Sequence, residues 1–323
     1  MNGTLGRDKI WNDQIWSDID KAVREEVGRI RVAQKVFPTT VVNNVLPVAA
    51  NKLFQSTGAQ GHILGGVGGA VLHTGKDIFQ PFIELSIEFV LTPVQVDGEE
   101  NMRLARSLAR RAASLLASEE DRILFLGIPD PTDDEKKDGK SHFVTDAGVT
   151  ISNREHVEKG FVAEATKETP VPDSVVWAAG SLARPGPPPV PAGAGPGDLG
   201  NILAAVATGI AELNLRHQPG PYALFLSPGR YGQTFEPPKG QLLAPGDQIN
   251  HVVTGGFQMV SGIHNDIGIL VSLGGEPTRI VLGLDATTAF TYTDPQGHCH
   301  FRTFERIQWV VQDGRAFQRL TFP

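Results

Sequence analysis

The chain has one cysteine, no long apolar run and no excess of positive charge. The single thiol, Cys299, excludes an internal disulfide and suits a reducing compartment. No apolar run reaches the roughly 20 residues that span a bilayer, and the first eight residues lack the apolar core of a signal peptide. The net charge of -7 argues against a nucleic-acid-binding face. We therefore expect a soluble cytoplasmic protein with neither a membrane nor a nucleic-acid partner.

Two stretches resemble nucleotide-binding loops but lack the surrounding sequence. The glycine run at 65–69 is followed by Val71-Leu72-His73-Thr74-Gly75, which is not helical, whereas a dinucleotide site needs a helix N-terminus there. Gly139-Lys140-Ser141 lacks the earlier glycine of a phosphate loop, because Asp134 stands in its place. A flexible loop is the favoured interpretation of the glycine run, and the phosphate-loop match at 139–141 fails.

Candidates for catalysis are few. His298 and His300 flank Cys299 and, in a strand, would lie on the same face, where they could hold a metal ion. Two ligands do not make a metal site, so we favour a strand end whose histidines are solvated. Glu84 and Glu88 also share a strand face, and salt bridges are favoured over acid–base chemistry. The acidic runs at 119–121 and 133–135 are interpreted as solvated loop charge. We expect no cofactor, no metal and no enzymatic activity, with a metal-dependent enzyme using the two histidines as a remote alternative.

The hydrophobic pattern predicts helices and strands in segregated groups, which is typical of an α+β fold. Helical spacing predicts helices over 15–36, ending at Pro38, over 101–118 and over 202–215. Alternating or continuous apolar residues predict strands over 82–91, 222–226, 252–260, 267–273 and 280–284, with one or two more over 300–322. The stretch 39–77 is rich in Val, Gly and Asn and has little core of its own, and 184–197 is a Pro/Gly linker.

Several short motifs occur in one order along the chain. Trp16, Ile19-Asp20 and Arg24-Glu25 lie in the first helix, and Pro81-Phe82-Ile83-Glu84-Leu85 opens a strand. An acidic run at 119–121 precedes Phe125 and Gly127, Gly220-Pro221-Tyr222 opens a buried strand, and Leu282-Gly283-Leu284-Asp285 lies in a later one. Together they resemble the encapsulins, shell proteins with the tailed-phage major-capsid fold.

The resemblance implies a domain organisation. Residues 1–38 would form an N-terminal arm and helix, and 39–92 an extension loop that reaches onto a neighbouring subunit. A peripheral domain would combine 93–127 with 284–323, and an apical domain would span 198–283. Residues 128–197 would be an insertion, longer than in a typical member, that ends in the Pro/Gly linker.

The resemblance also implies a function. The chain would be the shell component of an encapsulin nanocompartment, a homo-oligomeric icosahedral cage that encloses a cargo enzyme, commonly a peroxidase or a ferritin-like iron oxidase serving oxidative-stress defence or iron storage. The cargo would bind through a C-terminal targeting peptide. The alternative is a prophage major capsid protein that packages DNA. The segment before the Trp-bearing helix argues against this alternative, because it is too short for a scaffolding segment.

Two sets of site residues follow from the resemblance. The stretch of the first helix that matches the cargo-peptide site contains Val27, Ile30, Arg31 and Gln34. Two apolar side chains would contact the peptide there, and the polar pair would form a rim. The loop that matches the fivefold pore contains Phe235, Glu236, Pro237, Pro238 and Lys239.

Overall fold

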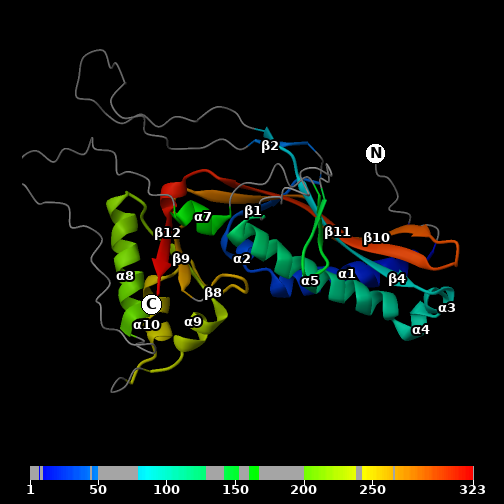
Figure 1. Ribbon diagram of the computed structural model, residues 1–323, viewed down its shortest axis with the longest axis horizontal. Helices are drawn as coiled ribbons and strands as arrows, with labels where there is room; N and C mark the ends of the chain where they lie inside the picture. Colours follow the sequence, from blue (N-terminus) through cyan, green and yellow to red (C-terminus); the bar gives the residue numbers. More distant parts are fainter. Residues whose placement is uncertain are drawn as a thin grey trace, which may run out of the picture. The chain divides into compact units, whose positions relative to one another are not determined.

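The computed structural model describes residues 7, 10–43, 46–49, 79–128, 142–152, 160–166, 200–237, 242–264 and 266–322. They belong to two compact units, labelled by element in Figure 1. The first unit contains Met1–Ala50, Ile78–Gly160 and Arg279–Val310, and the second contains Asn51–Asp77, Phe161–Thr278 and Val311–Pro323. The glycine run at 65–69, the stretch 139–141, the acidic run at 133–135 and the Pro/Gly linker lie outside the described residues.

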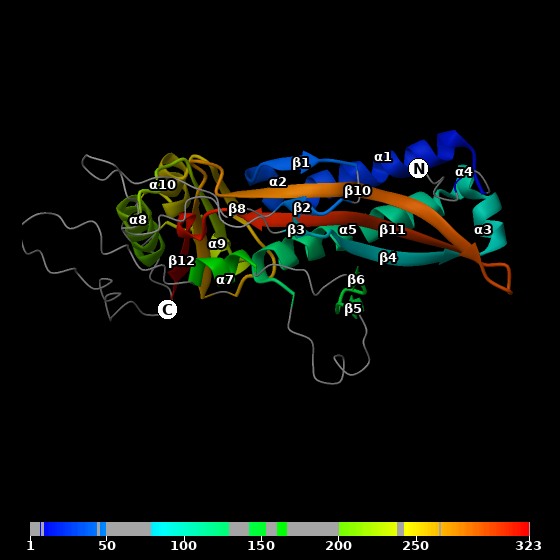
Figure 2. The same ribbon diagram turned by 90° about the horizontal axis from the view of Figure 1, so that it is seen from above.

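A six-stranded sheet is the centre of the first unit (Figure 2). Its strands, in spatial order, are β1 (Thr39–Val41), β10 (Thr278–Thr293), β11 (Cys299–Val311), β4 (Ile83–Leu91), β6 (Thr150–Ser152) and β5 (His142–Val144). β1 is parallel to β10, whereas β4 is antiparallel to both β11 and β6. β2 (Val48–Ala49) and β3 (Phe79–Gln80) form a separate two-stranded sheet. The predicted strand over 82–91 is thus present as β4.

The first predicted helix is divided in two. α1 (Asp13–Ile30) begins where the Asn12 side chain accepts the amide of Ile15, and α2 is Ala33–Val36. Arg31 between them is extended, with φ -47° and ψ 128°, so the single helix expected over 15–36 is wrong at this residue. The corner between α1 and α2 is the point from which the candidate site is built.

The acidic run at 119–121 is helical and buried, not solvated loop charge. α3 (Pro93–Asp97) and α4 (Glu99–Met102) precede α5 (Leu104–Leu126), which continues well past the helix predicted over 101–118 and ends at Gly127. The carboxylate of Glu99 accepts the amides of Ala105 and Arg106 at 2.7 and 3.0 Å and so caps the start of α5. Because α5 packs against α1 and β4, the turn at 119–121 carries its three carboxylates into the interior.

The second unit has a four-stranded sheet in the order β12 (Phe317–Thr321), β9 (Ile267–Ser272), β7 (Tyr222–Leu226) and β8 (Gly256–Met259). Its helices are α7 (Phe161–Thr166), α8 (Gly200–Leu215), α9 (Pro228–Gln233) and α10 (Pro245–Val252), and the 3₁₀ turn Gly314–Ala316 precedes β12. Of the strand expected over 252–260, only Gly256–Met259 is present, as β8, and Val252 is the last residue of α10. β12 pairs with β9, so the residues after 310 lie with this unit, whereas the sequence placed 284–323 in the other domain.

No helix among the described residues is long and apolar enough to cross a membrane.

Candidate functional site

A pocket of about 250 Å³ lies at the corner between α1 and α2. Three of the four residues predicted to bind a cargo peptide line it, namely Val27, Arg31 and Gln34. The fourth, Ile30, is half-buried and does not belong to the lining. The remaining lining residues are Arg24, Gly28, Lys35 and Asp285.

At Gly28, one wall of the pocket consists of helix backbone without a side chain. A Cβ atom built at this position would have no neighbouring heavy atom within 4 Å. A glycine inside a helix costs about 1 kcal/mol relative to alanine, and here no contact within the described chain requires it. Such a glycine lets another chain approach the helix backbone closely.

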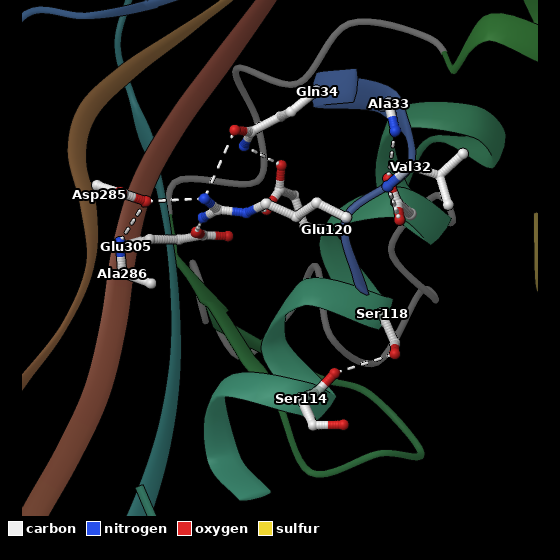
Figure 3. A network of polar contacts seen from close by, with 11 residues as sticks. Val32, Ala33, Gln34, Ser114, Ser118, Glu120, Asp285, Ala286 and Glu305 are labelled. Atoms are coloured by element: carbon white, nitrogen blue, oxygen red, sulfur yellow. Dashed lines mark hydrogen bonds and ion pairs between the residues drawn. The ribbon is translucent and has the colours of Figure 1, made fainter. Parts of the chain in front are cut away.

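Arg31 closes the inner side of the pocket and is almost completely buried, with 5% of its surface exposed. Its Nε donates to Glu120 Oε2 at 2.6 Å and its Nη1 to Asp285 Oδ1 at 2.8 Å. Its Nη2 donates to Glu305 Oε2. The three acceptors, labelled in Figure 3, come from α5, β10 and β11, and each supplies one carboxylate to the guanidinium. Each nitrogen of the Arg31 guanidinium therefore donates to a carboxylate of the same chain, which fixes this pocket wall.

Gln34 joins the same group of side chains, which we call the Arg31 centre (Arg31, Gln34, Glu120, Asp285 and Glu305). Its Nε2 donates to Glu120 Oε1 at 2.6 Å, and its Oε1 lies 3.5 Å from Arg31 Nη1. Both oxygens of Glu120 are thereby engaged. Arg31 and Gln34, which the sequence assigned to a polar rim, thus hydrogen-bond to carboxylates of the same chain and also line the pocket.

The charges of the Arg31 centre do not balance. Burial opposes the charged form of Arg31, but the carboxylates of Glu120, Glu305 and Asp285 raise its pKa above the usual value. Burial raises the pKa of Glu305 well above its usual value, Glu120 and Asp285 raise it further, and Arg31 lowers it. One guanidinium thus serves three carboxyl groups, and burial favours the protonated form of Glu305.

Asp121 anchors the other side of the corner. Its two oxygens accept the amides of Val32 and Ala33 at 2.8 and 2.9 Å, which caps the first turn of α2. Burial, together with the neighbouring Glu120, raises the pKa of Asp121 to about 7, although the two amides and Arg31 oppose the shift. α5 therefore holds the corner through Glu120 and Asp121 together.

The outer rim of the pocket is cationic. The side chain of Arg24 is exposed and has no hydrogen bond or ion pair with the described residues, and Lys35 Nζ donates to the carbonyl of Arg29 at 2.8 Å. Together with the open wall at Gly28, this rim can accept an extended peptide and hold it with charge-assisted hydrogen bonds to carbonyl or carboxylate oxygens.

The predicted pore loop is described only in part, because Pro238 and Lys239 lie outside the described residues. Phe235, Glu236 and Pro237 are exposed, and 59% of the Phe235 surface is accessible. The Phe235 ring packs edge-on against Tyr231 of α9, with ring centroids 5.2 Å apart. The loop therefore presents an aromatic and an acidic side chain to solvent.

The histidines near the end of the β10–β11 connection face a carboxylate. His298 Nδ1 and His300 Nε2 lie 3.0 and 3.5 Å from Asp294 Oδ2, and the His300 ring stacks on Tyr292. Cys299 is buried and free. Within the described part of the chain, no group of three or more His, Cys, Asp or Glu residues could hold a metal ion.

One of the two glutamates of β4 takes part in salt bridges. Glu84 contacts Arg302 and Arg306 of β11, with both distances 2.9 Å. The register places Arg306 directly opposite Glu84, whereas Arg302 lies opposite Glu88. The salt bridges expected from the sequence are present at Glu84, inside the chain.

The sequence analysis missed the role of Glu120, Asp285 and Glu305 as partners of Arg31. A signal existed for two of them, since Glu120 and Asp285 lie in motifs that carried the encapsulin resemblance. Glu305 lies in a strand without such a signal, and only the pairing of β11 with its neighbours places it.

Comparison with known proteins supports both the fold and the resemblance. Residues 185–307 match the family Linocin_M18, described as encapsulating protein for peroxidase. The virus-like particle from Pyrococcus furiosus has a similar structure, with a TM-score of 0.59 and 13% identity over 94% of this chain and 98% of that one. No protein with a curated description matches the sequence.

Phage-type capsids share the fold as well. The capsid of Myoviridae phage XM1 has a TM-score of 0.52 at 13% identity, over 91% of this chain and 92% of that one. The capsid of an empty GTA particle has a TM-score of 0.51 at 14% identity, over 90% of this chain and 89% of that one. The resemblance to encapsulins and the capsid-like α+β fold predicted from the sequence are confirmed.

Proposed function

We propose that this chain, encapsulin-like in sequence and capsid-like in fold, is the shell subunit of a cytoplasmic nanocompartment. Many copies assemble into a closed icosahedral cage that encloses a cargo enzyme, and the subunit performs no catalysis. The observation that carries the proposal is the family match over residues 185–307 within a fold whose similarity extends over nearly the whole chain.

The exposed apolar side chains support assembly. Leu46, Phe79 and Val144 of the first unit are each at least 60% exposed, and Leu242 of the second is 99% exposed. Large apolar side chains so open to water favour burial against other subunits. Leu46 and Phe79 lie within the segment 39–92, which the sequence assigns to an extension loop reaching onto a neighbour.

Electron microscopy and mass photometry of the purified protein test the assembly. We expect closed particles of uniform diameter and megadalton mass. A stable monomer at micromolar concentration, in neutral buffer of low ionic strength, would contradict the proposal. Protein mass spectrometry of purified particles identifies the cargo, which we expect to be a peroxidase or a ferritin-like protein.

We further propose that the pocket at the α1–α2 corner receives the C-terminal targeting peptide of that cargo. The support is the open backbone wall at Gly28, the adjoining Val27 and the cationic rim of Arg24 and Lys35. A disordered tail needs apolar burial and backbone hydrogen bonds to offset the cost of ordering. This pocket offers apolar burial and hydrogen bonds to the peptide backbone, and Arg31 holds its wall in place.

Filling the pocket tests this site. Gly28→Leu places a side chain in the open space, and we expect it to abolish cargo loading while particle yield is unchanged. Gly232→Leu is the matched control, because Gly232 is also helical and its Cβ would also meet nothing within 4 Å. Normal loading of Gly28→Leu particles would exclude the pocket as the cargo site.

A prophage major capsid protein is the second candidate, because capsids of phage XM1 and of the GTA particle share the fold. The contents of the particles separate the two functions. Nuclease-protected DNA inside particles purified from the native host would favour the capsid, whereas a co-purifying enzyme with a C-terminal peptide favours the nanocompartment.

A further inference from the structure

Glu305 has one oxygen that no donor satisfies. The side chain is 0% exposed and projects from β11 into the Arg31 centre. Oε2 accepts from Arg31, whereas Oε1 has no hydrogen-bond partner among the described residues. A buried carboxylate oxygen without a donor is costly, and a proton on that oxygen removes the charge that needs a donor. The geometry alone therefore indicates Oε1 as a proton-binding position.

The surrounding charges require such a proton. The groups that face Glu305 are Arg31 at the end of α1, Glu120 of α5 and Asp285 of β10. Asp121, next to Glu120, adds a further buried carboxyl group. With all of these groups ionised, three buried carboxylates and the carboxylate of Asp285, whose side chain is 38% exposed, would face the single positive charge of Arg31. Buried charge without a partner is strongly unfavourable, so part of this set is protonated in the folded chain.

We propose that Glu305 is the proton site of a pH-sensitive latch on the pocket. With a proton on Oε1, the Arg31 centre holds the α1–α2 corner in place. Loss of that proton adds an uncompensated buried charge beside Arg31, which loosens the corner and with it the pocket wall made by Arg31, Gln34 and Asp285.

The direction of the pH dependence follows from the proton. Burial first, and then Glu120 and Asp285, raise the pKa of Glu305 above its value in the unfolded chain. The folded state therefore binds this proton more tightly than the unfolded state does. The stabilisation by this proton is complete when the pH is below the pKa of Glu305 in the unfolded chain. It is lost as the pH rises through the pKa of Glu305 in the folded chain. The latch is closed at low pH and opens as the pH rises through the raised pKa of Glu305.

The proton site is tested without any cargo. We expect the Tm of the assembled protein to fall between about pH 5 and about pH 8, and to fall less in Glu305→Gln, whose amide imitates the protonated carboxyl. Glu84→Gln is the matched control, since Glu84 also pairs with arginines of the same sheet but is partly exposed. Equal falls in the wild type and in Glu305→Gln would overturn the proposal.

Two further measurements keep the test decisive if Glu305→Gln misfolds. Asp285→Asn removes a charge that raises the pKa of Glu305, so the fall in Tm should move to lower pH. Infrared spectroscopy of Asp121→Asn, in which Asp121 cannot contribute a protonated carboxyl, should show a protonated-carboxyl band in mildly acidic solution that fades as the pH rises. An unmoved transition in Asp285→Asn, or the absence of the band, would refute the proton site.

The link to the pocket rests on the proposed cargo function and has its own readout. A peptide copied from the C-terminus of the co-purifying cargo should bind more weakly at about pH 8 than at about pH 6 in the wild type, and nearly equally at both in Glu305→Gln. If Tm depends on Glu305 but peptide binding does not, the proton site stands and its role as a latch on the pocket fails. If the peptide binds at neither pH, the cargo function of the pocket fails.

Discussion

The carboxylate of Asp121 accepts the backbone amide of Ala33 at 2.9 Å, across 88 residues of sequence. Its other oxygen accepts the amide of Val32. A helix normally satisfies its first amides with a residue next to it in sequence. Here α5 supplies the cap for α2, so the N-terminal corner is held from the interior of the first unit.

Removing this cap should destabilise the chain. We expect Asp121→Ala to lower the free energy of unfolding by about 1–3 kcal/mol, because two buried amides lose their acceptor. Thermal unfolding measures the change, with Glu100→Ala, an exposed acidic residue of α4, as the control. A loss no larger than in the control would show that water replaces the carboxylate.

Asp121 also contributes to the pH dependence. Its pKa rises from 3.8 to about 7 on folding, mainly through burial. Because the folded state holds the proton more tightly, this contribution to stability is complete below pH 3.8 and is lost as the pH rises through about 7. In Asp121→Asn, the fall in Tm between about pH 4 and about pH 7 should be smaller than in the wild type. A variant with an unchanged pH profile would contradict the raised pKa.

Arg31 should be irreplaceable by lysine. Arg31→Ala leaves Glu120 and Glu305 buried without their cation, at a cost of about 3–5 kcal/mol. Arg31→Lys should recover little of this, because an ammonium group cannot reach three carboxylates on three elements with the geometry of a guanidinium. Particle yield and Tm report the effect, and a lysine variant of wild-type stability would contradict it.

Ile30→Asp separates packing from peptide binding. If Ile30 contacts the cargo peptide, the aspartate places a charge against apolar atoms and weakens the peptide affinity by roughly a few kcal/mol. Intact but empty particles would support that role. Lost particles would favour packing within the subunit, and normally loaded particles would exclude the peptide contact. The half-buried state of Ile30 leaves part of its surface accessible to a peptide.

Exposed Glu236 tests the pore loop. If the loop lines the fivefold opening, Glu236→Lys replaces a ring of negative charge by positive charge and slows the entry of divalent cations. Cobalt quenching of a fluorophore attached to the cargo measures this entry. Electron cryomicroscopy provides the decisive view, because a loop on the threefold axis or buried between domains would contradict the assignment.

Local sequence patterns determined much of the fold. The spacing of Trp16, Ile19, Val23 and Val27 predicts the buried face of α1, and all four are buried. The alternation in β4 and the continuous apolar run of β7 likewise predicted strands that the structure contains. These features could be predicted because helices and strands repeat with fixed periods, so a few neighbouring residues define the face that is buried.

The tertiary structure alone decided the site. The acidic run at 119–121 is interior because α5 continues past its predicted end and packs against α1, although charged runs are usually solvated. Arg31 meets Glu120, Asp285 and Glu305 across 89, 254 and 274 residues of sequence. No local period encodes contacts at such separations, because they depend on which strands pair and where a helix crosses them. The sequence could therefore place Arg31 near a binding site, but only the pairing of β10 and β11 beneath α5 gave it three carboxylates and left Glu305 with a proton to hold.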